Sequence, residues 1–96
     1  MPYSETNLKN SCLRWLKAAH PHIFTWKVSD RFKSGLPDLY LINKGQHLWI
    51  ELKRPDGETT RIQDYVMSLM IEAGAKVYVV RALSDFKNII EGRLQI

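Results

Sequence analysis

Apolar and polar residues recur along this chain at two spacings, and each spacing predicts a different kind of element. Near the start, apolar residues fall every three or four positions, which predicts an amphipathic helix from Glu5 to about Ala19 with Ser4 as its N-cap. From Ile23 to Val28 the residues alternate as in a first strand, which is expected to pair with the second. The apolar stripe of the helix consists of Leu8, Cys12, Trp15, Leu16 and Ala19.

The central stretch predicts two strands joined by a tight turn. Residues 39–42 form a short apolar run, residues 47–53 alternate, and the turn signal Asn43-Lys44-Gly45-Gln46 separates them. Because a type I′ turn would require a positive φ at Lys44, we expect a four-residue loop instead. One face of this pair is wholly apolar and carries Leu39, Leu41, Leu48, Ile50 and Leu52.

The second half of the chain predicts a helix, a buried strand and a short last helix. The first of these helices runs from about Arg61 to Ala73, with Thr59 or Thr60 as its cap and Gly74 as its stop signal. Ser84 is expected to cap the last helix. The strand lies at 77–80, so a strand-helix-strand unit implies a parallel pair. The predicted core stripe of the longer helix is Ile62, Val66, Leu69, Met70 and Ala73.

Together these elements predict an α/β fold with a mixed sheet of about four strands and helices on both faces. The 96 residues suffice for one domain, residues 1–96, whose small core would gain from dimerisation. A net charge of +4 suits a polyanionic partner, and a single cysteine fits a reducing compartment. The sequence contains no apolar run long enough to span a membrane, so we expect no membrane association.

The polar face of the central strands carries two carboxylates and a lysine. If the turn is centred between Lys44 and Gly45, Asp38 lies opposite Glu51, with Cβ atoms about 5 Å apart, and Lys53 follows on the same face. Two facing carboxylates repel each other unless a cation separates them, and Mg²⁺ prefers such oxygen ligands. A nearby lysine can stabilise charge on a phosphate or orient a water. The alternative is a solvated strand edge after a Pro-containing turn, but the apolar opposite face favours a site.

The segment Gly35-Leu-Pro-Asp38, followed by a turn and Glu51-Leu-Lys53, resembles the PD-(D/E)xK nuclease superfamily. Its spacing and small size are similar to the stand-alone, phage-like form of the virus-type replication-repair nuclease (VRR-NUC) family. The resemblance extends over nearly the whole chain. It implies a small restriction-endonuclease-like fold and Mg²⁺- or Mn²⁺-dependent hydrolysis of phosphodiester bonds in DNA.

The resemblance also implies roles for individual residues. The metal ligands would be Asp38, Glu51, the backbone carbonyl of Leu52 and Glu5 on the first helix. Catalysis would depend on these carboxylates and on Lys53. Gln63 would assist by orienting Lys53 or a phosphate.

Basic residues on both sides of the predicted site are expected to bind DNA phosphates: Arg31, Lys33, Arg54 and Arg61. Lys9, on another face of the first helix, is expected to be solvated. Asp56 also follows a proline, but the turn sequence after it predicts a surface position.

By analogy with the family, the expected substrate is branched DNA in replication, recombination or repair. We expect a homodimer acting on four-way (Holliday) junctions in the cytoplasm of a bacterial or phage-infected host cell, without a small-molecule cofactor. The alternatives are a non-catalytic DNA-binding module of the same fold, a flap-type nuclease, and a structural subunit. Exposed apolar residues that could support a dimer are expected to be Trp15, Trp26, Tyr78 and Phe86.

Overall fold

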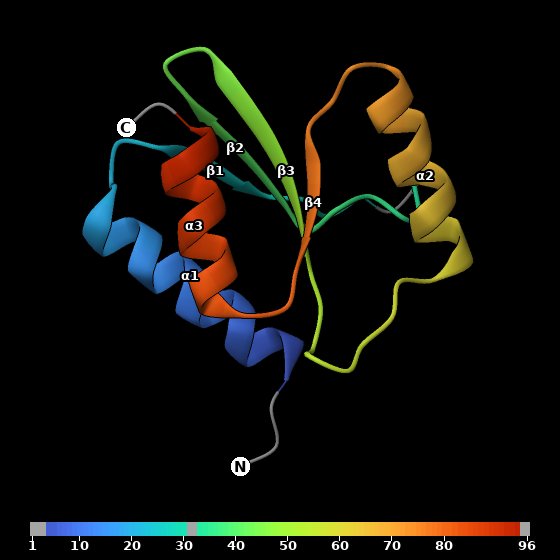
Figure 1. Ribbon diagram of the computed structural model, residues 1–96, viewed down its shortest axis with the longest axis horizontal. Coiled ribbons are helices and arrows are strands. Elements are labelled where there is room, and N and C mark those ends of the chain that lie inside the picture. Colours follow the sequence, from blue (N-terminus) through green and yellow to red (C-terminus); the bar gives the residue numbers. More distant parts are fainter. Residues whose placement is uncertain (1–3, 31–32, 95–96) are drawn as a thin grey trace.

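The four strands form one mixed sheet in the order β1-β2-β3-β4 (Figure 1). The first three strands pair antiparallel, and β3 and β4 pair parallel, as expected for a strand-helix-strand unit. The computed structural model describes residues 4–30 and 33–94. Within these ranges the elements are α1 (Glu5–Ala19), β1 (Phe24–Lys27), β2 (Leu39–Asn43), β3 (Gln46–Leu52), α2 (Arg61–Glu72), β4 (Val77–Val80) and α3 (Leu83–Arg93).

The hydrophobic core lies between one face of the sheet and the pair α1 and α3, while α2 stands on the other side of the sheet (Figure 1). The apolar face predicted for the central hairpin is confirmed, because its five residues are completely buried. Helix α1 contributes Leu8, Cys12 and Leu16, and α3 contributes Phe86 and Ile90. No helix in the described parts of the chain has the length and apolarity needed to cross a membrane.

The hairpin has the predicted register but not the predicted loop. Leu39 pairs with Ile50 and Asn43 with Gln46, so only Lys44 and Gly45 remain in the turn. Their φ angles are 48° and 80°, as a two-residue type I′ turn requires, and the expected four-residue loop was therefore wrong. Lys44 adopts this unfavourable left-handed conformation because the pairing of β2 with β3 continues up to Asn43 and Gln46 and leaves only two residues for the turn.

Gly35 fixes the approach of the chain to β2. Its φ is 86°, and a Cβ at this position would come within 2.7 Å of the carbonyl oxygen of Ile62. The backbone before β2 therefore packs directly against the first turn of α2. This contact holds Asp38, three residues later, close to the N-terminus of that helix.

The predicted core stripe of α2 was partly wrong. Val66 and Met67 are buried, whereas Ile62 and Leu69 are 47% and 43% exposed. The helix packs against β4 at the edge of the sheet and covers only part of that face, so its apolar arc exceeds what the sheet can bury (Figure 1).

Two expectations about the rest of the chain also need correction. Helix α3 begins at Leu83 after Ala82, without a side-chain cap, so packing of its apolar face rather than Ser84 determines where it starts. Among the aromatic residues expected on the surface, only Trp26 is well exposed. Phe86 is fully buried, and Trp15 and Tyr78 are half-buried against the core.

Candidate active site

Asp38 lies immediately before β2 and its carboxylate is fixed by the backbone of β3. Its neighbour Leu39 pairs with Ile50, so Asp38 occupies the register position opposite Glu51, as the sequence predicts. Its Oδ2 accepts the N–H of Leu52 at 2.8 Å, and its own carbonyl accepts the N–H of Val28. One carboxylate oxygen is thus held by the strand, which leaves Oδ1 for another partner.

Glu51 is a carboxylate inside the protein, with only 2% of the residue exposed. Its Oε2 accepts a hydrogen bond from Gln63 Nε2 at 3.1 Å and lies 3.5 Å from Lys53 Nζ. The pKa of Glu51 is raised to about 7, chiefly by burial; the negative charges of Asp38 and Glu5 also raise it, and Lys53 lowers it. Lys53 thus lies beside two carboxylates, Glu5 and Glu51.

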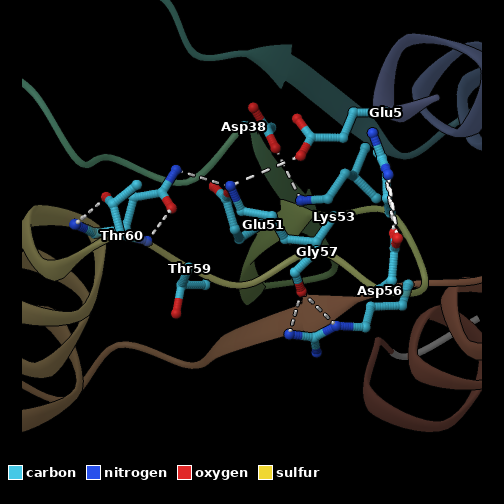
Figure 2. Close-up of polar contacts among 12 residues, drawn as sticks. Glu5, Asp38, Glu51, Lys53, Asp56, Gly57, Thr59 and Thr60 are labelled. Atoms are coloured by element: carbon cyan, nitrogen blue, oxygen red, sulfur yellow. Dashed lines mark hydrogen bonds and ion pairs between the residues drawn. The ribbon is translucent and has the colours of Figure 1, made fainter.

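Lys53 and Glu5 complete the cluster from two different elements (Figure 2). The N–H of Lys53 donates to the carbonyl of Val80, which extends the β3–β4 ladder by one residue and fixes the lysine. Its Nζ lies 3.7 Å from Glu5 Oε1, although Lys53 itself is only 8% exposed. Glu5 begins α1, where Ser4 accepts the N–H of Asn7 as the predicted cap.

Gln63 connects the first turn of α2 to this cluster. Its Oε1 accepts the N–H of Thr60 at 2.9 Å, and the Thr60 hydroxyl accepts the N–H of Gln63, so the two residues form a capping box. The remaining amide group of Gln63 donates to Glu51. The hydrogen bond thus goes to Glu51 and not to Lys53, which the family resemblance had offered as a partner.

The predicted DNA-binding residues lie in exposed positions where the structure describes them. Lys33 and Arg61 are exposed, and Arg31 lies outside the described residues. Arg54 is exposed but its guanidinium donates to Asp56 over 3.1–3.2 Å, which lowers the pKa of Asp56. Asp56 is therefore the surface turn residue that the sequence predicts.

Sequence reasoning missed two basic residues near the site. Arg81, after β4, donates from Nε and Nη2 to the carbonyl of Gly57 and so holds the loop between β3 and α2 (Figure 2). Lys9 was expected to be solvated, but its Nζ lies 3.9 Å from Asp38 Oδ1. Its place four residues after Glu5, on the same side of a helix, was the available signal.

The donor set suits a hard divalent cation that retains part of its water shell. Among the described residues, no three His, Cys, Asp or Glu side chains form a ready-made metal cage. Mg²⁺ does not need one, because in proteins it usually binds one or two carboxylates and several waters. Asp38 and Glu51 provide these carboxylates. After burial, the charge of Asp38 is the next cause of the raised pKa of Glu51, and a cation between the two carboxylates would relieve that repulsion.

Comparisons with known proteins agree with this architecture. No protein-family model matches the chain, and no curated protein matches it in sequence. A solved structure described as "VRR_NUC domain" superposes with a TM-score of 0.77 at 22% sequence identity. The match covers 91% of this chain and 94% of that one, so it extends over essentially the whole fold. The fold expected from the VRR-NUC resemblance is therefore confirmed.

Proposed function

We propose that this protein is a divalent-metal-dependent endonuclease that hydrolyses phosphodiester bonds in DNA. The observation that carries the proposal is the buried Glu51 carboxylate, held against Asp38 and Lys53 with a pKa near 7. Keeping such a group inside the protein lowers its stability, and a nuclease site gives a reason for it. The confirmed fold and the net charge of +4 support DNA as the substrate.

Each residue of the cluster has a role in this proposal. Asp38, Glu51 and the carbonyl of Leu52 would hold Mg²⁺ or Mn²⁺, with Glu5 as a further ligand. The bound ion would supply a Lewis acid and a more acidic water for attack on phosphorus. Lys53 stabilises the charge that develops on the phosphate, and Gln63 keeps Glu51 in position. By analogy with the superfamily, the product would carry a 5′-phosphate.

A cleavage panel separates this proposal from its alternatives. Labelled duplex, flap, splayed and four-way DNAs are incubated with Mg²⁺ or Mn²⁺ and either wild type or Asp38→Asn. We expect wild type to cleave and Asp38→Asn to bind DNA without cleaving it. Binding without cleavage by wild type would favour a non-catalytic DNA-binding module, and neither binding nor cleavage would favour a structural subunit.

The DNA path predicts unequal effects for two arginines. Arg61 is exposed at the start of α2, whereas Arg54 is already paired with Asp56. We therefore expect Arg61→Ala to flatten the log-log salt dependence of DNA binding by roughly 0.9, the value for one duplex phosphate contact, and Arg54→Ala to have a smaller effect. Fluorescence anisotropy over a salt series measures both slopes. Equal slopes for wild type and Arg61→Ala would place the DNA elsewhere.

Selectivity for four-way junctions and a two-fold homodimer form the finer part of the proposal. Phe24 and Trp26 are 56% and 57% exposed. Trp26 of β1 pairs with Tyr40 of β2, on the sheet face that also carries Glu51. Tyr65 and Leu69 of α2 add exposed apolar surface. An apolar face of this composition is typical of an interface. A two-fold axis there would relate two cleavage sites, as paired nicking of a junction requires.

Dimerisation through this face predicts that Phe24→Ser combined with Trp26→Ser gives a monomer. We expect light scattering at micromolar protein to show a dimer for wild type and a monomer for the double variant. A stable interface buries about 1,000 Å² or more, and the two substitutions remove two exposed aromatic side chains from this surface. Mixed dimers of wild type and Asp38→Asn should nick a junction on one strand without resolving it. A wild-type monomer that cuts flaps faster than junctions would identify a flap-type nuclease instead.

A further inference from the structure

Lys9 is a basic residue beside the site to which the proposed chemistry gives no role. It lies on α1 one turn after Glu5, and both side chains extend toward the same cluster, Glu5 to Lys53 and Lys9 to Asp38. The Lys9 side chain is 35% exposed and that of Asp38 28%, so the pair lies at the rim of the site. An ion pair with this exposure and a 3.9 Å separation contributes little to stability. Fold stability therefore does not explain the position of Lys9.

The oxygen that Lys9 approaches is also the one that Asp38 has available for a ligand. Oδ2 accepts the Leu52 N–H at 2.8 Å, while Oδ1 faces Lys9 Nζ. A cation bound at Oδ1 would displace the ammonium group from this oxygen by charge repulsion. The lysine would then remain at the rim of the site, where an incoming phosphate must pass.

The charges of the cluster support the same conclusion. Three carboxylates, Glu5, Asp38 and Glu51, surround two lysines, Lys9 and Lys53. With all five groups ionised, a divalent cation would bring the cluster from one net negative charge to one net positive charge. That charge complements one phosphodiester group. Without Lys9 the loaded cluster would be neutral and would attract a phosphate at the rim of the site less strongly.

We propose that Lys9 is a second phosphate-binding lysine of the site, paired with Asp38 in the metal-free protein and with a phosphate of the DNA strand in the complex. This inference deepens the proposed nuclease function. It assigns substrate binding to the side chain at the rim and leaves transition-state stabilisation to the buried Lys53.

The test uses Lys9→Met, Lys9→Arg and the control Lys17→Met, which removes an exposed lysine at the other end of the same helix. DNA binding is measured by anisotropy in Ca²⁺ over a salt series. Lys9→Met should flatten the log-log slope by roughly 0.9 relative to Lys17→Met, and Lys9→Arg should restore it. Lys9→Met should also bind Mn²⁺ more tightly, by roughly threefold, because a positive charge beside Asp38 has gone.

A flatter salt slope for DNA binding together with tighter Mn²⁺ binding would indicate a lost phosphate contact. Local misfolding would instead weaken both metal binding and DNA binding. A Lys9→Met slope equal to that of Lys17→Met would overturn the proposal, even if wild type cleaves DNA and the nuclease assignment stands. If wild type binds Mn²⁺ but does not cleave DNA, while Lys9→Met still shows the flattened slope, Lys9 is supported as a phosphate contact. Only the nuclease assignment would then be lost.

Discussion

Replacing Glu51 with glutamine should abolish cleavage and at the same time stabilise the metal-free protein at alkaline pH. The residue is 2% exposed, and its pKa of about 7 means that the folded state disfavours its charge. Glutamine keeps the size of the side chain and can still accept from Gln63, but it carries no charge. The same substitution removes a proposed metal ligand, so stability and activity should change in opposite directions.

The pH dependence of this gain follows from the direction of the pKa shift. In the unfolded chain Glu51 titrates near 4.5, whereas the folded protein holds the proton up to about pH 7. The contribution of protonated Glu51 to the free energy of unfolding is therefore fully present at low pH. It decreases as the pH rises from 4.5 to about 7 and is lost above pH 7. At pH 8 we expect the free energy of unfolding of Glu51→Gln to exceed that of wild type by about 1–3 kcal/mol. At pH 5.5 the difference should shrink, because wild type is then largely protonated.

Thermal or urea unfolding in the presence of a chelator measures both values. Glu72→Gln is a suitable control, since Glu72 is exposed at the end of α2. A gain at pH 8 of about 2 kcal/mol would raise the midpoint temperature of a domain of this size by roughly 10 °C. A Glu51→Gln protein less stable than wild type at pH 8 would contradict the electrostatic description of the site.

Lys53→Met should lower the cleavage rate by about 10²–10³ while leaving the fold intact. Its Nζ is the cation nearest to Glu51, and methionine retains the buried aliphatic stem without the charge. The lysine lowers the pKa of Glu51, so its loss should raise that pKa further. Rates should therefore be compared at pH 8.5, where Glu51 is more fully ionised in both proteins.

Single-turnover cleavage at saturating DNA separates this effect from binding. We expect the rate constant to fall and the DNA affinity in Ca²⁺ to change little, because Lys53 is only 8% exposed. Lys17→Met on the far end of α1 serves as the control. Turnover near the wild-type rate would make Lys53 an internal counter-ion for Glu5 and Glu51 without a catalytic role.

The sequence predicted the parts of this structure that depend on periodicity along one element. The register followed from the turn between Lys44 and Gly45, and this register places Asp38 opposite Glu51. Ser4 was predicted as the N-cap of α1, and Thr60 is one of the two threonines predicted to cap α2. Such features depend on local chemistry, so one stretch of sequence is sufficient to find them.

The errors arose where one element meets another. The exposure of Ile62 and Leu69 depends on how far α2 extends over the sheet, which helical spacing does not reveal. The approach of Lys9 to Asp38 and the bond from Gln63 to Glu51 depend on the tertiary placement of two helices against one strand end. Lys44 shows the reverse case, in which a continuous ladder imposed a backbone angle that the residue alone disfavours.

Calorimetric titration with Mn²⁺ measures whether Asp38 helps to bind a divalent metal ion. Wild type and Asp38→Asn are compared at pH 7.5, with Asp85→Asn as a control at an exposed position in the first turn of α3. The metal-centre assignment predicts saturable binding to wild type and to the control, and at least a tenfold weaker affinity, roughly 1.4 kcal/mol, for Asp38→Asn. Equal Mn²⁺ affinity in all three proteins would contradict it.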